Sequence, residues 1–336
     1  PFLNNLFRDP AIISLPSILR VPLAKFISIR RAPIARKIYN HLGGSSPLLR
    51  LTQEQAVALG KALDEQDPQH CYRVFISMRY WHPLSEETVS AVQSFDPDEI
   101  LLLPLYPQYS TATSGSSFID WEKSAAKLGL VKPTYTLCCY PVDENWATAQ
   151  SDLLRVQIDA LENEQKYRVL FSAHGLPKKI VDRGDPYQWQ VERSAEAIAK
   201  VADLTEEAWT VCYQSRVGPL EWIGPSLDDE LKRAATDGVA VILLPIAFVS
   251  EHSETLVELD IEYKEIAKEL GIASYKRVPA LGTHPDFICG LRDLSLKAFR
   301  NKINFGPPEN TRFCPQKAEK CQCALYQNLT RNSQYD

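Results

Sequence analysis

The chain has 336 residues, of which 45% are hydrophobic and 24% are charged, and its net charge is −5. These values are typical of a globular protein with room for two domains of ordinary size. They give no reason to expect a nucleic-acid partner. No apolar run approaches the roughly 20 residues needed to span a bilayer, and no signal-peptide pattern opens the chain. Eight cysteines in a chain of this length do not indicate a secreted disulfide framework.

The first 47 residues are rich in apolar side chains and are interrupted by prolines. Arg30, Arg31 and Arg36 follow the most apolar part. One interpretation is a pair of helices packed on the core. The other is an apolar lip edged by arginines, which suits contact with an anionic membrane surface.

Helical and strand patterns alternate along the rest of the chain. Helices are predicted over residues 52–65, 86–94, 116–127, 145–162, 188–201, 227–235, 253–270 and 285–301, and strands over 72–76, 100–105, 134–139, 167–172, 209–213, 239–246 and 274–278. This alternation predicts an α/β fold with mainly parallel sheets flanked by helices. A domain boundary is expected near Lys166, which divides residues 1–165 from 166–304. Residues 305–336 form an extension outside the repeating pattern.

A histidine ends one of the predicted strands. The apolar run from Tyr167 stops at Gly175 and Pro177, so His174 is expected at the strand's carboxyl end. In an open α/β sheet, ligands bind at this edge. A lone histidine is usually structural, so its position alone leaves both readings open.

A second histidine, His252, follows the next long apolar strand and precedes an acidic helix. Glu254, Glu258 and Glu262 are spaced four residues apart and would form one stripe on a regular helix. The simpler interpretation is a solvated acidic face. However, like charges at this spacing repel each other, and no Lys or Arg occurs between residues 251 and 262. The stripe therefore favours cation or proton handling, and imidazole with carboxylate suits a divalent first-row metal.

Three cysteines lie close together near the C-terminus. Cys314, Cys321 and Cys323 are separated by six residues and then by one. Thiols so close together in a polar segment favour a metal or cluster site. A zinc ion with four thiolates and a 2Fe-2S cluster each need a fourth ligand.

Several ordered motifs together resemble the ferrochelatase family, whose members insert ferrous iron into a porphyrin to make haem. The resemblance spans nearly the whole chain, and its motifs are SMRYWHP at 77–83, LYPQYS at 105–110, SAHGLP at 172–177, RGDPY at 183–187, YQSRVGPLEWIGP at 213–225 and PIAFVSEHSETLVELDIEY at 245–263. The family begins with a strand and a Gly-Gly-Pro loop, whereas this chain opens at Pro1, so the first strand is expected to be missing. The resemblance implies two Rossmann-like, chelatase-type domains with the active-site cleft between them.

The resemblance also implies roles for individual residues. His174, Glu254 and His252 would be catalytic, and His174 and Glu254 would meet the Fe²⁺ substrate. Glu251, Glu258 and Glu262 would form the proton or metal path. Porphyrin would be bound by residues that lie in the lip, after strand ends and before the acidic helix: Arg31, Tyr39, Ser46, Arg79, Tyr80, Trp222 and Phe248. Arginine suits the porphyrin carboxylates because its guanidinium binds carboxylates in a bidentate way.

Many ferrochelatases hold a 2Fe-2S cluster with C-terminal cysteines and one internal cysteine. This chain resembles the bacterial type with a C-terminal cysteine cluster, and the resemblance implies a 2Fe-2S cluster here too. Animal-type members place the internal ligand directly after YPQYS, where this chain has Thr111. Cys138 and Cys139 are the remaining candidates, and the sequence does not choose between them.

The expected function is therefore insertion of Fe²⁺ into protoporphyrin IX with release of two protons, the last step of haem biosynthesis. The expected location is the cytoplasm, peripheral to the inner membrane, and a homodimer is left open. A coproporphyrin III ferrochelatase and a cobalt chelatase would share the catalytic residues. A haem or iron carrier, which is not an enzyme, would use the same cleft without turnover.

Overall fold

The computed structural model describes residues 1–13, 15–162, 165–216, 218, 220–303, 306–307 and 312–325. The strands are β1 Ile100–Leu102, β2 Thr134–Thr136, β3 Tyr167–His174, β4 Trp209–Gln214, β5 Ala240–Pro245 and β6 Tyr275–Arg277. The helices are α1 Phe2–Arg8, α2 Ser17–His41, α3 Leu48–Gln66, α4 Ser85–Phe95, α5 Ser114–Leu128, α6 Glu144–Asp159, α7 Lys178–Asp182, α8 Tyr187–Val201, α9 Leu227–Thr236, α10 Tyr263–Glu269 and α11 Pro285–Asn301. A 3₁₀ turn, η1, covers Glu206–Ala208, and a π-helix, η2, covers Glu254–Glu262.

Two parallel sheets organise the chain, as the alternating pattern predicts. β1 pairs with β2, and a second sheet has the order β4-β3-β5-β6. Strands β3 and β5 have fully buried apolar side chains because helices cover both faces of their sheet. The α/β fold with helix-flanked parallel sheets is therefore confirmed.

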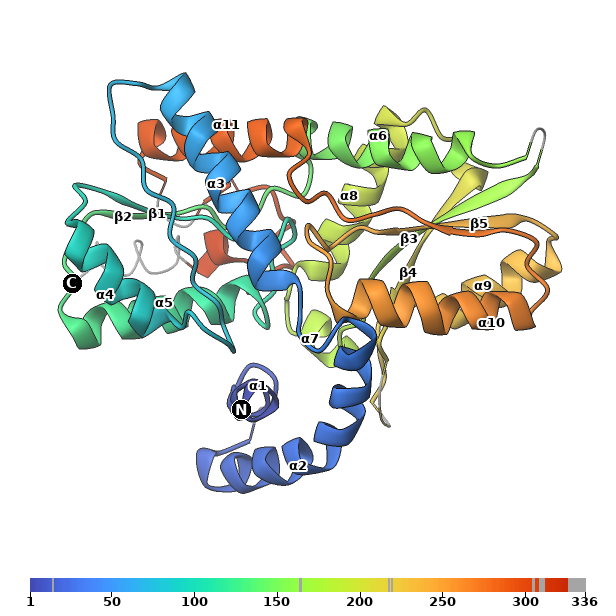
Figure 1. Cartoon of the computed structure of the whole chain (residues 1–336), viewed down its shortest axis with the longest axis horizontal. Coiled ribbons are helices and arrows are strands. Elements are labelled where there is room, and N and C mark those ends of the chain that lie inside the picture. The colour runs from blue at the N-terminus through green and yellow to red at the C-terminus, as the bar shows by residue number, and fades with distance from the viewer. Residues whose placement is uncertain are drawn as a thin grey trace.

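Two helices cross over between the sheets. α6 precedes the second sheet in the chain but packs on α8 and β5, whereas α11 follows that sheet but packs on α3 and the β1-β2 sheet (Figure 1). β1 and β2 fall within residues 1–165 and β3 to β6 within 166–304, while each part lends one helix to the other sheet, so the predicted domain division stays a prediction. The segment after α11 also returns to the first sheet, since the N–H of Cys138 donates to the carbonyl of Gly306 at 3.0 Å.

The predicted strand at 72–76 is wrong, because these residues make no ladder with any strand among the residues described. A cavity of about 1160 Å³ is lined both by this segment and by β1, together with side chains of α3, α5 and α11. An extended segment becomes a strand only when a neighbouring backbone takes up its N–H and C=O groups. The segment has the apolar pattern of a strand, but no strand in the described part of the chain pairs with it.

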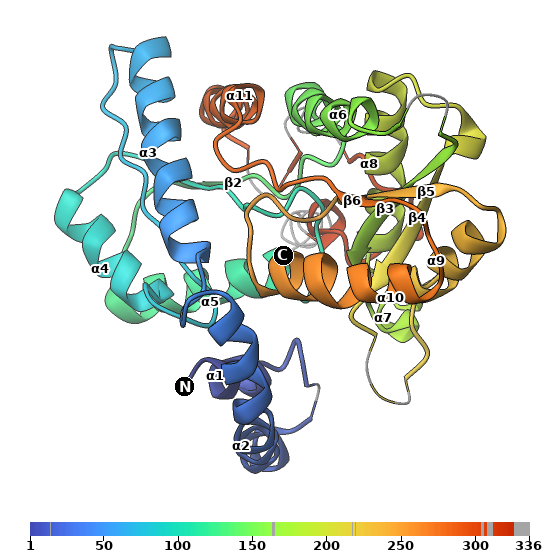
Figure 2. The same cartoon turned by 45° about the vertical axis from the view of Figure 1, so that its right-hand side comes forward.

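Helices α1 and α2 form a pair that projects away from both sheets (Figures 1 and 2). Ala24 is the one buried residue of α2. Large apolar side chains of α2 stay in contact with solvent, among them Ile18, Phe26 and Ile29 at 81%, 57% and 65% exposure. This is unlike a pair packed on the core, so the geometry agrees with the alternative interpretation of an apolar lip. No helix in the described part of the chain is both long enough and apolar enough to cross a bilayer.

Candidate active site

The second sheet brings the predicted catalytic residues to one edge. His174 ends β3, Ser215 follows β4, and the segment from Phe248 to His252 follows β5. β4 and β5 flank β3 as parallel neighbours, so the three carboxyl ends lie side by side. His174 and His252 therefore lie at the carboxyl edge of the sheet, as the strand ends predict.

The imidazole of His174 has a defined orientation. Its Nδ1 lies 2.7 Å from the carbonyl oxygen of Gly175. A carbonyl can only accept, so Nδ1 carries the proton and Nε2 keeps its lone pair in the neutral ring. Trp222 packs against the same loop, because a Cβ placed on Gly175 would lie 3.2 Å from the Trp222 ring. His174 can therefore accept a proton or bind a metal through Nε2.

His252 lies beside an aromatic ring and a carboxylate. The rings of Phe248 and His252 are 4.6 Å apart between centroids, and Nε2 of His252 is 3.9 Å from the Glu254 carboxylate. Burial lowers the pKa of His252, and the charge of His174 lowers it further, although Glu254 and Glu251 oppose this. His252 is therefore held towards its neutral form.

Several buried polar atoms at this edge have no hydrogen-bond partner in the described part of the chain. They are Nδ1 of His252, Oε2 of Glu254, Oε2 of Glu251 and Nε1 of Trp222. Buried polar atoms are usually satisfied, so such a concentration points to a place where a ligand completes the hydrogen bonds.

The acidic stripe lies mainly on a π-helix instead of the regular helix expected at 253–270. The N–H of Tyr263 bonds the carbonyl of Glu258, five residues back. A π-helix has more residues per turn than an α-helix, so Glu254, Glu258 and Glu262 still share one face. Glu254 and Glu258 are half-buried, whereas Glu262 is exposed. The stripe therefore leads from the site to solvent.

Glu258 has a raised pKa. Burial raises the pKa of Glu258 to about 7, and neighbouring Glu254 adds to the rise. The Ser215 hydroxyl is 2.7 Å and 2.8 Å from the two carboxylate oxygens and lowers the pKa in part. A carboxyl group that titrates near neutral pH is suited to proton transfer. Ser215 was missed, although its position after a strand in YQSRVGP could have indicated it.

Glu251 is held differently from the rest of the predicted path. Its Oε1 accepts hydrogen bonds from Nη1 of Arg277 at 2.8 Å and from the N–H of Ala280 at 2.9 Å. Burial raises the pKa of Glu251, but the Arg277 guanidinium beside it outweighs this and holds the pKa below its usual value. Residues 251–262 contain no Lys or Arg, but Arg277 from β6 pairs with both Glu251 and Asp260, so these two carboxylates are compensated from another strand.

A buried amide from α3 fixes the loop that carries His252. Gln55, which is 2% exposed, donates to the carbonyls of Val249 at 2.9 Å and Gly282 at 2.8 Å. Its Oε1 accepts from the Ser250 hydroxyl at 3.0 Å. The first part of the chain therefore helps to position the loop that carries His252 in the second.

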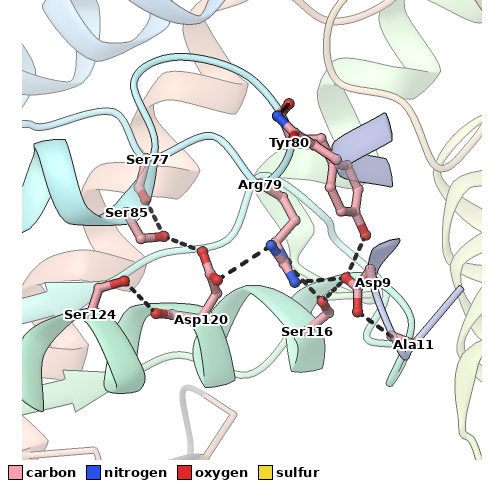
Figure 3. Close-up of polar contacts among 10 residues, drawn as sticks. Asp9, Ala11, Ser77, Arg79, Tyr80, Ser85, Ser116, Asp120 and Ser124 are labelled. Atoms are coloured by element: carbon pink, nitrogen blue, oxygen red, sulfur yellow. Dashed lines mark hydrogen bonds and ion pairs between the residues drawn. The ribbon is translucent and has the colours of Figure 1, made fainter. Parts of the chain in front are cut away.

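The predicted porphyrin contacts Arg79 and Tyr80 lie at the base of the lip, where both bond to Asp9 (Figure 3). Oδ2 of Asp9 accepts from Nη2 of Arg79 at 2.7 Å, the Tyr80 hydroxyl at 2.8 Å and the Ser116 hydroxyl at 2.6 Å. Nη1 of Arg79 also lies 3.4 Å from Asp120. The Arg79 charge is thus already compensated. Asp9 was missed because nothing in its local sequence distinguishes it.

The other predicted porphyrin contacts are spread along the lip. Arg31 is exposed on α2, and its guanidinium lies 5.9 Å from the Phe7 ring centroid. Tyr39 is half-buried near the end of α2, and burial raises its pKa. Ser46 lies in the turn before α3 and accepts the N–H of Leu48 at 3.3 Å. The structure therefore places these three residues in sequence from the lip towards the body.

Five cysteines gather in one buried cluster, which includes Cys138 and Cys139 just after β2. Cys138 Sγ lies 3.2 Å from Cys139 Sγ and 3.6 Å from Cys323 Sγ. Contact with Cys314 and Cys323 lowers the pKa of the Cys321 thiol, although burial opposes the change. All five are buried. The predicted C-terminal trio therefore meets both internal candidates.

The family model for ferrochelatase matches residues 1–298. The chain belongs to the ferrochelatase family. A Pelagibacter ubique ferrochelatase is 50% identical over 97% of this chain and 94% of its own length. A Caulobacter vibrioides ferrochelatase is 49% identical over 96% of the chain and 92% of its own length. A ferrochelatase of the Wolbachia of Drosophila simulans is 50% identical over 88% of this chain and 93% of its own length.

Solved structures share the fold at low identity. SirB from Bacillus subtilis, solved with Fe³⁺, superposes with a TM-score of 0.53 and 14% identity, covering 75% of this chain and 93% of SirB. The chelatase-type fold is therefore confirmed. As a member of the ferrochelatase family, the protein is an enzyme that inserts iron into a porphyrin.

Proposed function

We propose that this ferrochelatase inserts Fe²⁺ into protoporphyrin IX, with His174, His252 and Glu254 at the reacting centre. The observation that carries this assignment is the convergence of unpartnered nitrogen and oxygen atoms at the carboxyl edge of β3 and β5. Nε2 of His174 is an available base, and His252 and Glu254 have buried polar atoms without partners. Imidazole and carboxylate groups suit both roles the reaction requires, which are to bind Fe²⁺ and to accept pyrrole protons.

The reaction replaces two pyrrole N–H protons by one Fe²⁺, so two protons must leave the site. In this proposal His174 and Glu254 meet the pyrrole nitrogens and the iron, and His252 supports them. Glu258, with its pKa of about 7, passes protons towards exposed Glu262. Glu251 belongs to this path as a fixed negative charge, since Arg277 holds it ionised.

The porphyrin is proposed to enter between the lip and the second sheet. Arg31, Tyr39 and Ser46 line its approach, and Arg79, Tyr80, Trp222 and Phe248 lie nearer the reacting edge. Gripping the ring out of plane would expose the pyrrole nitrogens to the metal and move the bound state towards the transition state. Because Arg79 is already paired with Asp9 and Asp120, the porphyrin carboxylates depend on the lip arginines. This favours a substrate with two carboxylates over one with four.

An anaerobic assay tests the function directly. Purified protein is mixed with Fe²⁺ and protoporphyrin IX, and metalloporphyrin formation is followed by absorbance. Faster turnover of coproporphyrin III would show a four-carboxylate substrate instead. A strong preference for Co²⁺ and a corrin precursor would indicate a cobalt chelatase. Stable haem binding without turnover would identify a carrier and overturn the proposal.

The five buried thiols are proposed to hold a 2Fe-2S cluster through Cys314, Cys321, Cys323 and either Cys138 or Cys139. Four thiolates around one zinc ion would lie about 3.8 Å from one another in a tetrahedron. Among the residues described, no three cysteine sulfurs lie within 4.8 Å of one another, so the thiols fit a larger group better than a single ion. Cys138 is favoured as the fourth ligand because its Sγ lies 3.6 Å from Sγ of Cys323. Such a cluster carries one electron when bound, and it would cross-link the C-terminal segment to the first sheet.

The lip is proposed to rest on the cytoplasmic face of the inner membrane. Exposed apolar side chains on α2 lie near Arg30 and Arg31, a combination that suits an anionic bilayer surface. Both porphyrin and haem are apolar enough to enter membranes, so a lip in the bilayer would shorten their path to the cleft. Association of two copies into a homodimer is tested by measuring the molecular mass of the protein in solution.

A further inference from the structure

Gln190, in the first turn of α8, presents its amide to two cysteine sulfurs. The side chain is fully buried. Its Oε1 accepts the N–H of Tyr109 at 2.7 Å, and its Nε2 lies 3.1 Å from Cys314 Sγ and 3.4 Å from Cys139 Sγ. A main-chain N–H can only donate, so the amide oxygen must face Tyr109 and the amide NH₂ must face the sulfurs.

This orientation matches sulfur that carries negative charge. A neutral thiol is a weak acceptor, and burying an amide donor against weak acceptors is unfavourable. A thiolate, free or bound to a metal, accepts a stronger, charge-assisted hydrogen bond. Gln190 is thus placed as a donor to metal-bound thiolates.

The amide is held in place by contacts that do not involve sulfur. Tyr109, whose N–H donates to Gln190, is itself anchored, because its hydroxyl donates to Oε1 of Gln322 at 3.0 Å. One turn along α8, the Ser194 hydroxyl donates to the carbonyl of Pro141 at 2.7 Å and accepts from Nε2 of Gln108 at 2.8 Å. These bonds join α8 to the segment that carries Gln108 and to Pro141, which follows Cys138 and Cys139 closely in the chain. The NH₂ group is therefore preorganised towards the sulfurs.

We infer that Gln190 is a positioning residue for the iron–sulfur cluster: its NH₂ group hydrogen-bonds cluster thiolates and raises the reduction potential of the cluster. This inference rests on the proposed 2Fe-2S cluster. Reduction adds negative charge to the cluster, and a hydrogen bond to its sulfurs stabilises the more negative state. Gln190 also bonds Tyr109 of the LYPQYS segment, so one amide from α8 joins the cluster to the first part of the chain.

The test compares Gln190→Leu and Gln190→Glu with the parent and with Gln188→Leu. Gln188 is a matched control, because it lies on the same helix and bonds Glu192 at 3.2 Å. Proteins are purified without oxygen, iron and acid-labile sulfide are measured, and the midpoint potential is determined by a redox titration followed by electron paramagnetic resonance. Gln190→Leu should shift the potential downwards, Gln190→Glu should do the same, and Gln188→Leu should match the parent.

A second measurement covers the case in which Gln190→Leu fails to assemble a cluster. Resonance Raman spectra of the parent in H₂O and D₂O should show a shift of the iron–thiolate stretching bands, because an exchangeable N–H bonds the sulfur. In Gln190→Glu, whose side chain is nearly the same size, the isotope shift should be reduced. Unchanged potentials in cluster-loaded variants, or an isotope shift unaffected by Gln190→Glu, would overturn the role of Gln190 alone. A parent without iron and sulfide would overturn the cluster and this inference together.

Discussion

The carboxylate of Asp9 lies 2.7 Å from the guanidinium of Arg79 and joins the lip to the body of the enzyme. Asp9 follows α1, while Arg79 follows the segment that faces β1. The N–H of Ala11 donates to the other oxygen of Asp9 at 2.8 Å, so the carboxylate also shapes the turn into α2. One buried side chain therefore fixes both the fold of the lip and its attachment.

Replacing Asp9 by Asn should loosen the lip. The change leaves the partly buried Arg79 without its closest counter-charge, and removing one partner of a buried pair costs about 3 kcal/mol or more. Limited proteolysis should cut the first 47 residues faster, and the urea midpoint should fall. Asp98→Asn is the control, because Asp98 is exposed. A lip that resists protease as well as the parent would contradict this role of Asp9.

Removing the His174 imidazole should abolish metal insertion but leave porphyrin binding nearly unchanged. Loss of a general base typically costs about 10²- to 10⁴-fold in rate. Glu254→Gln should be nearly as damaging, since it removes a negative charge beside the metal. Turnover is measured anaerobically, and porphyrin binding by fluorescence quenching. His70→Ala is the control, because His70 is exposed and its ring bonds Asp67. Turnover of His174→Ala within a few-fold of the parent would remove His174 from the mechanism.

The pH dependence of insertion should contain a limb set by Glu258. Its pKa of about 7 lies above the usual value of 4.5, so the carboxyl stays protonated in the folded protein from about pH 4.5 to 7. Below pH 7 it cannot accept a proton, and the rate should rise as pH passes through about 7. Glu258→Gln should lower the rate and remove that limb.

The same shift affects stability. Because the folded state binds the proton more tightly, the stability that Glu258 contributes at low pH is lost as pH rises through about 7. Glu258→Gln lacks this loss. The difference in free energy of unfolding, variant minus parent, should therefore be larger at pH 8 than at pH 5. Equal differences at both pH values would mean that the pKa is not raised.

An acidic residue on the exposed face of α2 should weaken membrane binding. Ile18 and Ile29 are 81% and 65% exposed, and burying each in a bilayer contributes hydrophobic free energy that an aspartate would lose. Ile18→Asp and Ile29→Asp should sediment less with vesicles that contain anionic lipid. Reversing the charges of Arg30 and Arg31 should reduce only the salt-sensitive part. Val131→Asp is the control, because Val131 is 89% exposed outside the lip. Equal sedimentation of all variants would exclude the lip as the contact.

Replacing Cys321 by Ser should bleach the protein and loosen its C-terminal segment. A ligand's loss weakens the cluster, and cluster binding is coupled to the folding of the segment that carries the ligands. The parent purified without oxygen should contain iron and acid-labile sulfide in equal amounts, and the variant should lose both. Cys71→Ser, an exposed thiol, should retain them. If the parent contained zinc instead of iron and sulfide, the thiols would form a structural zinc site and the cluster prediction would be wrong.

The sequence predicted the sheets and the position of the candidate site at one sheet edge because both depend on local patterns. An apolar run that ends in Gly or Pro marks a strand end, and the histidines that follow such runs in β3 and β5 lie together simply because the strands are parallel. What it missed depends on partners distant in the chain. The segment 72–76 has a strand pattern but pairs with no strand among the described residues, and Arg277 neutralises Glu251 from another strand. The π-helical hydrogen bonds of η2 leave no simple mark in its spacing. Asp9 and Gln190 are ordinary residues until folding brings them to Arg79 and to the thiols.

The thiol group has a consequence for the order in which the protein is made. Cys138 and Cys323 are 185 residues apart, yet their sulfurs lie within 3.6 Å. A chain leaves the ribosome from its N-terminus, and its early segments begin to fold before later ones exist. Cys138 and Cys139 are therefore synthesised before the whole second sheet, and Cys323 is synthesised after it. Any ion or cluster that needs all of these thiols can be inserted only after Cys323 has been synthesised, so its delivery follows the synthesis of both sheets.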